Sequence, residues 1–371
     1  MMILLQLLFY LFLLATWIQL AYWLLLFSRL AFYRSPPPPV VEPEPVSLII
    51  CAHNEAENLV QNLPYFLAQD YPFLEIIVVN DFSSDKSFPI LLEIQKSHPI
   101  LRLVSISADT PPGKKVALSK GIKAASFDLI LLSDADCRPN SPMWVGHMQA
   151  FVKGKTEIGL GYGPYFSRGN GILNAFIRFE TVYTACQYFS FAFVGLPYMG
   201  VGRNLMYRKH LFYQVQGFAH HQDLASGDDD LFINQVATKH NTQVILSPDT
   251  FVFSEPKSSW RGYYRQKARH ISTGRRYRLV HRLALGLLAA SHFGHYVLGI
   301  VLLLNHFSEL TVFVHFLVRI GVVSAMYAWI LHRLKDRALI RWVPIFDALY
   351  ICYYLLFAPV LTGKKEKWNW Q

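Results

Sequence analysis

The chain has long apolar stretches at its two ends and a more polar middle. Residues 1–28 contain no charged side chain, and about 20 apolar residues suffice to cross the hydrocarbon core of a bilayer. Three further apolar stretches of nearly that length follow, at residues 283–305, 310–331 and 342–361. We therefore predict one amino-terminal transmembrane helix and about three transmembrane or re-entrant helices within residues 283–361. A signal peptide would have a charged start and a shorter apolar core, so it is the weaker interpretation of the first stretch.

Positive charges near these stretches predict their orientation. Arg29 and Arg34 follow the first stretch, and the short loop at residues 332–341 is also basic, which places both on the cytoplasmic side by the positive-inside rule. The basic tail within residues 362–371 would then lie outside, against the rule, so either the last stretch is re-entrant or the rule fails here. We expect an integral protein of the bacterial inner membrane whose polar middle lies in the cytoplasm.

Composition agrees with a membrane protein, because only 16% of the residues are charged whereas soluble chains have roughly 25%. The net charge of +10 comes largely from basic side chains at residues 261–282, directly before an apolar stretch. Anionic lipid headgroups explain this cluster more simply than nucleic acid does. The four cysteines lack paired spacing, which predicts reduced thiols and neither a disulfide framework nor a zinc site; they are Cys51, Cys137, Cys186 and Cys352.

The polar middle alternates between strand and helix patterns. Six prolines among residues 36–45 predict a stiff extended linker over residues 29–45, with an SH3-type ligand as the alternative. Helical patterns of about 10 to 15 residues separate the strands, which is typical of βαβ units. We predict an α/β domain with a parallel-dominated sheet over residues 46–258, its strands at residues 46–51, 75–80, 101–105 and 129–133.

Two aromatic segments in the second half are harder to interpret. Residues 172–194 are apolar but interrupted by charges, which suits either a helix in the membrane interface or a buried core helix. Residues 259–282 combine aromatic and basic side chains and are predicted to lie at headgroup depth. The histidines in the later apolar stretches are either tolerated polar residues or part of a lipid or proton path; they are His292, His295, His306 and His315.

Carboxylates follow the predicted strands. Asp134 and Asp136 come directly after an apolar run, Glu55 follows the first strand, and Asp81 follows the second. Ligands of open α/β sheets collect beyond the carboxyl ends of the strands, and hard divalent cations prefer oxygen ligands. A nucleotide and a metal ion would fit there, although a solvated turn explains two aspartates equally well. The chain has neither a GxGxxG nor a Walker A pattern, which removes the main support for dinucleotide or P-loop binding.

Several short motifs follow one another in order: Ala-His-Asn-Glu at 52–55, Val-Val-Asn-Asp-Phe-Ser-Ser at 78–84, Asp-Ala-Asp at 134–136, Gly-Val-Gly-Arg-Asn at 200–204, Gly-Asp-Asp-Asp at 227–230 and Gln-Lys-Ala-Arg-His at 266–270. Each is weak alone. Together, over about residues 46–277, they resemble the inverting family 2 glycosyltransferases of the GT-A fold, in particular the membrane-bound type with Asp-x-Asp and Gln-x-x-Arg motifs.

The resemblance implies a nucleotide-sugar donor, a divalent cation such as Mg²⁺ or Mn²⁺, and inversion at the anomeric carbon. Glu55 and Asp81 would contact the nucleoside, and Asp136 would bind the metal with Asp134 beside it or near the ribose. Lys114 is a candidate phosphate contact, as is Lys115, although a solvated helix start explains both lysines equally well.

The resemblance also implies a general base from an acidic group at the start of a helix. Counting back from residues 239–241 selects Asp229, with Asp228 as the rival; helix capping is the other explanation. Gln266 and Arg269 match the motif that holds donor or acceptor near the membrane. His270 stands where the family has tryptophan, which weakens the case for processive elongation.

We expect a membrane enzyme that transfers one sugar to a lipid acceptor at the cytoplasmic face. A processive polysaccharide synthase is the first alternative. A non-catalytic protein or transporter that binds nucleotide sugars is the second. The sugar, the lipid and the oligomeric state are not predicted.

Overall fold

The computed structural model describes residues 1–107, 113–169, 171–224 and 226–362. Within these residues a seven-stranded sheet has the order β3-β2-β1-β4-β7-β6-β8. The strands β1 to β4 pair in parallel, as predicted, while β7 runs antiparallel to both β4 and β6. The strand bounds are β1 Val46–Ala52, β2 Leu74–Asn80, β3 Leu101–Ser105, β4 Leu129–Asp134, β6 Ile158–Leu160, β7 Leu205–Arg208 and β8 Thr242–Val244.

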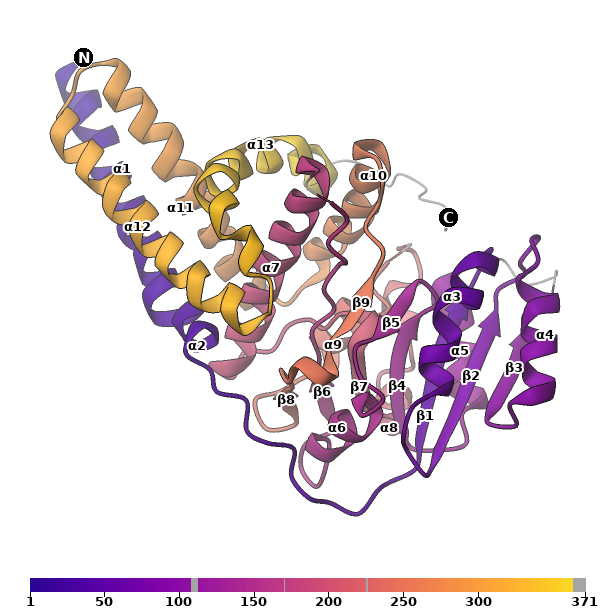
Figure 1. Ribbon diagram of the computed structural model, residues 1–371. Coiled ribbons are helices and arrows are strands. Elements are labelled where there is room, and N and C mark those ends of the chain that lie inside the picture. The colour runs from indigo at the N-terminus through magenta and orange to yellow at the C-terminus, as the bar shows by residue number, and fades with distance from the viewer. Residues whose placement is uncertain (108–112, 170, 225, 363–371) are drawn as a thin grey trace.

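Helices cover both faces of this sheet (Figure 1). One apolar core holds side chains of α3 (Ala56–Leu67), α4 (Ser87–Ser97) and α6 (Trp144–Phe151), and the other holds side chains of α5 (Lys114–Ala124) and α7 (Ile172–Phe193). Gly121 lets α5 approach the sheet closely, because a Cβ there would lie 2.6 Å from Ile49 Cγ2. Because β1, β2 and most of β4 are buried, their sequences are mostly apolar runs rather than alternating patterns.

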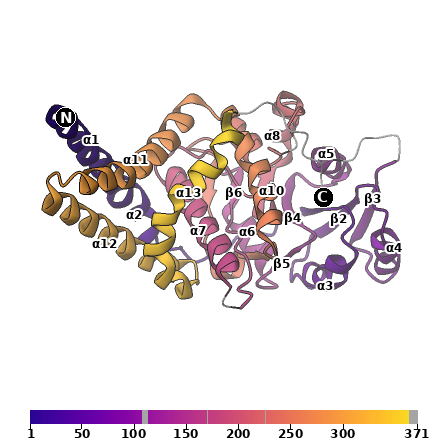
Figure 2. The same ribbon diagram turned by 90° about the horizontal axis from the view of Figure 1, so that it is seen from above.

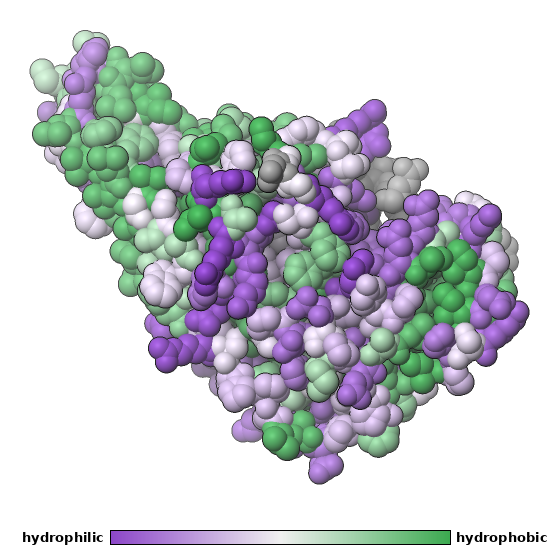
Figure 3. All heavy atoms as spheres, in the orientation of Figure 1, coloured by the Kyte–Doolittle hydropathy of each residue, from purple (hydrophilic) through white to green (hydrophobic). Residues whose placement is uncertain are grey.

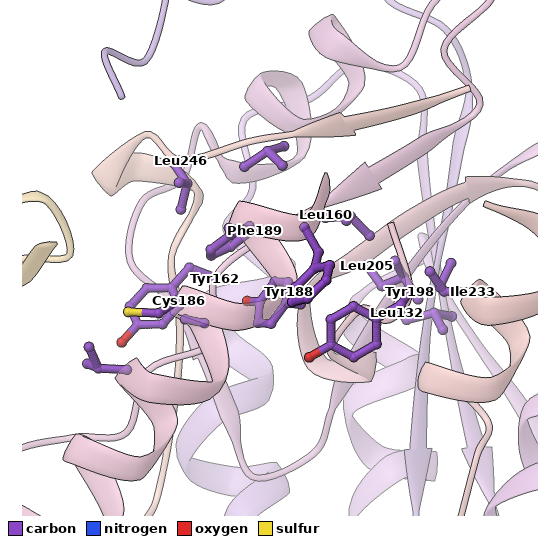
Figure 4. Close-up of a cluster of buried hydrophobic side chains, with 14 of the residues drawn as sticks. Leu132, Leu160, Tyr162, Cys186, Tyr188, Phe189, Tyr198, Leu205, Ile233 and Leu246 are labelled. Carbon is purple, nitrogen blue, oxygen red and sulfur yellow. The ribbon is translucent and has the colours of Figure 1, made fainter. Parts of the chain in front are cut away.

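Helix α7 is a core helix, so the interfacial interpretation of residues 172–194 is wrong. Most of its side chains are buried. Figure 4 shows Tyr188 and Phe189 of α7 in one apolar cluster with Leu132, Leu160 and Leu205 of three strands. Its charges are compensated by other elements: Arg178 pairs with Asp336, and Glu180 pairs with Lys267.

Shorter elements complete the α/β part. A second sheet pairs β5 (Cys137–Pro139) with β9 (Val252–Ser254) just beyond β4. Helices α8 (Lys209–Gln214) and α9 (Asp230–Val236) follow β7, and α10 (Trp260–Ile271) and a 3₁₀ turn at Ser272–Arg276 lead to the later apolar helices. The proline-rich linker runs along the α/β part to β1 (Figure 1), and Ser35 Oγ there donates a hydrogen bond of 2.6 Å to the Leu246 carbonyl.

Four helices of the described residues are long and apolar enough to cross a membrane, at Met2–Ala31, Leu279–Leu304, Glu309–Arg333 and Arg337–Val360. The first contains α1 (Met2–Ala21), a π-helical turn (Tyr22–Phe27) and α2 (Ser28–Ala31); the next two are α11 and α12; the last contains a 3₁₀ segment (Arg337–Trp342) and most of α13 (Val343–Thr362). Helices α1, α11 and α12 project together from the α/β part (Figure 1), and hydrophobic residues cover much of this projection (Figure 3).

Helix α13 leaves this bundle and lies over the α/β part. Seen from above, it runs between the projecting helices and α10 (Figure 2), and it packs against α7, α10, α11 and α12. Phe357 of α13 stacks on Tyr264 of α10, with ring centroids 5.1 Å apart. The basic tail of residues 362–371 lies, from residue 363 onward, outside the described residues.

A polar cluster joins the four apolar helices in their interior. Arg319 of α12 forms an ion pair of 2.5 Å with Asp347 of α13 and donates a hydrogen bond to Gln19 of α1. His292 Nδ1 lies 3.1 Å from Tyr354 Oη, and His295 Nδ1 lies 2.7 Å from Thr16 Oγ1. These two histidines are therefore buried and bonded between helices, whereas His306 is exposed and His315 is partly buried.

Candidate active site

A cavity of about 1150 Å³ opens where the strand-end residues meet. Its floor contains carboxylates at the carboxyl ends of β1 and β4 and in the loop before α9. Its walls come from α7, α10, α11 and α13. Most ligand pockets occupy about 300–1000 Å³, so this cavity has room for more than a small ligand. It connects the edge of the sheet with the apolar helices.

The aspartates Asp134 and Asp136 form a candidate metal site together with Cys137. Asp134 is the last residue of β4, and ligand atoms of Asp134, Asp136 and Cys137 lie within 4.8 Å of one another. Burial and the charge of Asp134 raise the pKa of Asp136. Among the described residues, two weak donors approach Asp136, namely Cys137 Sγ and Ser254 Oγ at 3.3 Å each. A divalent cation would relieve this repulsion, so the residues present fit the metal ion that the sequence predicts.

Lys114 connects the two acidic groups of the cavity floor. Its ammonium lies 2.9 Å from Asp134 Oδ1 and 3.3 Å from Asp228 Oδ2. Burial alone would lower the pKa of Lys114, but these carboxylates and Asp229 hold it well above its usual value, so Lys114 is charged. Lys115 points elsewhere, because its ammonium donates to the backbone carbonyls of His221 and Leu224.

The three consecutive aspartates before α9 have different partners. Asp228 is buried and pairs with Lys114; burial opposes its ionisation, but Lys114 lowers its pKa. Asp230 is buried and accepts hydrogen bonds from Thr273 and Tyr277. All three aspartates line the cavity, but Asp229 alone of the three is partly exposed.

Asp229 is held in place by backbone donors. Its Oδ2 accepts a hydrogen bond from the N–H of Gly202 and its Oδ1 from the N–H of Asp230, each at 2.7 Å. Burial, followed by repulsion from Asp228 and Asp230, raises the pKa of Asp229 to about 7. A carboxylate with a pKa near neutrality can accept a proton from a substrate hydroxyl and release it again.

Of the two residues expected to hold the nucleoside, one lines the cavity and the other does not. Glu55 lines the cavity, and burial raises its pKa, with smaller contributions from Asp136 and Asp134. Asp81 is fully buried; its Oδ2 accepts a 2.9 Å hydrogen bond from Gly113 N, and its Oδ1 has no partner among the described residues. The structure therefore brings Glu55 together with the aspartate pair, whereas Asp81 is not among the residues that line this cavity.

Helix α10 forms the wall between the acidic floor and the apolar helices. Gln266 donates to Tyr165 Oη at 3.3 Å, and Arg269 lines the cavity with its Nε unpartnered in the described structure. His270 also lines the cavity and is exposed to it. Desolvation by the surrounding protein, and next the positive charges of Arg269 and Lys267, hold the pKa of His270 well below its usual value, so its imidazole is neutral at pH 7.

Several cavity residues were not singled out from the sequence. Arg203 stacks over Tyr165, and its Nε donates to the Gly163 carbonyl at 3.0 Å. Lys257 lines the cavity from the loop between β9 and α10. Arg203 lies within the Gly-Val-Gly-Arg-Asn motif, which was a signal for it, whereas nothing in the local sequence distinguishes Lys257 from a surface lysine.

The end of the cavity farthest from the aspartates is apolar. Helices α11 and α13 form it, and we call it the apolar chamber; it is lined by Leu285, Leu288, Ala289, Phe293, Tyr353 and Phe357. One face of α11 supplies four of these residues, at the spacing of a helical stripe. The same cavity thus has an acidic floor, a mixed polar wall on α10 and an apolar chamber.

Comparison with known proteins identifies relatives of part of the chain. Residues 47–213 match the family Glycosyl transferase family 2. A poly-beta-1,6-N-acetyl-D-glucosamine synthase of Staphylococcus epidermidis is 36% identical over 110 residues, which are 30% of this chain and 25% of that protein. The Staphylococcus aureus (strain COL) protein of the same name is 32% identical over 108 residues, 29% of this chain and 26% of that protein. The match spans about a quarter of these relatives' length.

A solved structure shares the fold over nearly the whole chain. The mannosyltransferase PcManGT from Pyrobaculum calidifontis, in complex with GDP-Man and Mn²⁺, superposes with a TM-score of 0.60 at 16% identity. The alignment covers 93% of this chain and 98% of that one. At this identity the likeness concerns the fold alone.

Proposed function

Because residues 47–213 belong to glycosyl transferase family 2 and the chain has the GT-A fold, we propose that this protein transfers a sugar from a nucleoside-diphosphate donor to a lipid acceptor. The reaction would take place at the cytoplasmic membrane surface with inversion at the anomeric carbon. One observation carries the proposal: a single cavity joins the acidic floor to the apolar chamber. A lipid acceptor needs both environments, because its hydroxyl must reach the reaction centre while its chain stays out of water.

In this proposal the acceptor hydroxyl lies beside Asp229. As that hydroxyl attacks the anomeric carbon, Asp229 takes its proton, and the bond from that carbon to the diphosphate breaks. The backbone donors Gly202 and Asp230 fix the carboxylate before the reaction, and a pKa of about 7 suits proton transfer near neutral pH. Asp228 is the weaker candidate, since it is buried and paired with Lys114.

The opposite side of the floor would hold the donor. Glu55 would contact the nucleoside, and Arg269 would approach the diphosphate, for which its planar guanidinium is suited. Lys114 would keep positive charge near the leaving group, where negative charge increases during the reaction. When bound, a divalent cation held by Asp136 and Asp134 would also neutralise charge on the diphosphate.

Asp81 and Gln266 would support the site rather than react. Asp81 has one unpartnered buried oxygen, which is able to accept a hydrogen bond from a nucleoside that extends past Glu55. Gln266 would hold the Tyr165 ring on the cavity wall. The apolar helices, by length and composition, would anchor the enzyme so that the chamber lies at bilayer depth.

A processive polysaccharide synthase is the second candidate function, because the matching staphylococcal proteins are named as such synthases. The two functions differ in their products. Purified protein is incubated with labelled nucleotide sugars, UDP-N-acetylglucosamine and GDP-mannose included, and with a total bacterial lipid extract. Single transfer gives organic-soluble lipid whose mass is greater by one sugar residue, whereas polymer from the purified protein would contradict the lipid proposal. Absence of transfer to every acceptor would favour a binding protein.

A further inference from the structure

The apolar chamber has no role in binding a nucleotide sugar. Its walls are leucine, alanine and aromatic side chains, and Leu288 and Phe357 are almost fully buried. A sugar polymer needs hydrogen-bond partners for its hydroxyl groups, and an aliphatic wall offers few, so burying such a polymer there would be unfavourable. A hydrocarbon chain has no such requirement and gains free energy on leaving water.

Two residues that line the cavity on α11 and α13 are exposed, so the chamber would open between these helices. Ala290 of α11 and Ala358 of α13 line the cavity and are exposed. Beside them the outer faces of the same two helices carry exposed leucines, including Leu287 and Leu355. Both helices are among those long and apolar enough to cross a membrane, so this opening would face lipid rather than water.

The cavity that contains the chamber is also lined by His270 and Asp229. The neutral imidazole of His270 is exposed to the cavity at the level of α10 and is able to hydrogen-bond a hydroxyl without adding charge. One cavity thus combines an apolar chamber, a neutral hydrogen-bonding group and a carboxylate. These three environments suit a lipid whose long chain ends in a hydroxyl-bearing head.

We propose that the hydrocarbon chain of the acceptor enters sideways between α11 and α13 and lies in the apolar chamber, with its head group at His270 and its hydroxyl at Asp229. This inference rests on the proposed function and adds the binding site of the chain. The substrate class is a long-chain lipid taken from the bilayer. The small side chain of Ala289 leaves room for the hydrocarbon chain, and a larger side chain there would reduce this room.

The test enlarges Ala289 and leaves the outer face of α11 as the control. Ala289→Leu and Ala289→Trp fill the chamber in two steps. Leu287→Trp adds similar bulk two positions earlier, where the side chain is 48% exposed and does not line the cavity. The full-length purified protein is used, and donor binding within twofold of the unmodified protein establishes that each variant is folded.

Binding is measured with a 16-carbon alcohol that carries a photoactivatable diazirine at its far end, followed by mapping of the labelled peptides. We expect adducts at the residues that line the chamber, reduced at least fivefold by Ala289→Trp, reduced less by Ala289→Leu and unchanged by Leu287→Trp; these residues are Leu285, Leu288, Ala289, Phe293, Tyr353 and Phe357. Equal labelling of the unmodified protein and of Ala289→Leu and Ala289→Trp, or adducts confined to outward residues such as 283 and 355, would overturn the inference.

Transfer to the lipid extract separates this inference from the proposed function. We expect Ala289→Trp to lower transfer at least tenfold while Leu287→Trp retains it. If the Ala289 variants transfer at the unmodified rate, the chamber assignment is wrong while the lipid acceptor stands. If the unmodified protein transfers no sugar to lipid but its chamber is labelled, the proposed function fails and the binding site remains.

Discussion

The backbone N–H of Gly202 donates a hydrogen bond to Asp229 Oδ2 at 2.7 Å, which holds this carboxylate at the wall of the cavity. A side chain at position 202 would crowd the same carboxylate, because a Cβ there would lie 3.2 Å from Asp229 Oδ2. The contact orients Asp229 and also stabilises its ionised form, against the opposing effects of burial and of Asp228 and Asp230. The proposed base is thus fixed by the fold before any substrate binds.

The pH dependence of transfer should report Asp229. A base acts only when deprotonated, and burial together with the neighbouring aspartates raises the pKa of Asp229 to about 7. The rate at saturating substrates should therefore rise about tenfold per pH unit below pH 7 and level off above it. Rates measured from pH 5 to 9 test this, and a rate that is constant from pH 5 to 7 would contradict the assignment.

Lys114 should set the position of that pH profile. Its ammonium favours ionisation of Asp229, so Lys114→Met should raise the pKa of Asp229 and move the midpoint to higher pH. Lys115→Met is the control, because the Lys115 ammonium faces backbone carbonyls instead. The same pH series measures both variants. A midpoint that stays in place in Lys114→Met, or moves equally in both, would exclude this electrostatic role.

Metal removal should stop transfer. Asp136 is a partly buried carboxylate with a raised pKa, and the donors described near it are weak, so a cation is expected to bind there. EDTA should abolish activity, and added Mn²⁺ or Mg²⁺ should restore it. The variant Asp136→Asn should raise the metal concentration needed for half of the maximal activity at least tenfold. Ser254→Ala removes a single long hydrogen bond to Asp136 and should change that concentration less than threefold. Full activity in EDTA would show that Asp136 has another role.

The Arg319–Asp347 ion pair should stabilise the packing of α13 on the bundle. Both side chains are buried, so Asp347→Leu leaves the Arg319 charge without its partner and should cost about 3–5 kcal/mol. Arg319→Met together with Asp347→Leu removes both charges and should recover most of that loss. Thermal unfolding of the purified protein in detergent measures the cycle. Equal losses in the single and double variants would mean that the pair contributes through shape alone.

The first half of the α/β domain was predictable because its strands are long and buried. The predicted strands at residues 46–51, 75–80, 101–105 and 129–133 are confirmed within one residue at each end, since uninterrupted apolar runs bounded by polar residues leave few alternatives. The strands β6 and β8 were missed because three residues are too few to show a period.

The four apolar stretches were also predictable, from length and the lack of charge. The place of α13 was not, because it depends on partners far away in the chain, such as Tyr264 and Arg319. For the same reason the sequence did not decide whether α7 is a core helix or an interfacial helix. The partners of its charges, Asp336 and Lys267, lie more than 80 residues away in the chain.

The candidate site was also predictable from the sequence only in part. Motif order brought Asp134, Asp136, Asp229 and Arg269 into one hypothesis, and all four line one cavity. The sequence selected Asp229 as the base with Asp228 as the rival, and the different partners of the three aspartates at 228–230 also favour Asp229, which stays a prediction. The apolar chamber could not be predicted at all, because it arises from how α13 crosses α11.

The most direct test of the account compares Asp229→Asn with the unmodified protein for transfer of labelled sugar into the lipid extract. Asparagine keeps the size of the side chain but cannot take a proton at neutral pH, so we predict that transfer falls about 10²- to 10⁴-fold while donor binding changes less than twofold. Full transfer by Asp229→Asn would contradict the proposed mechanism.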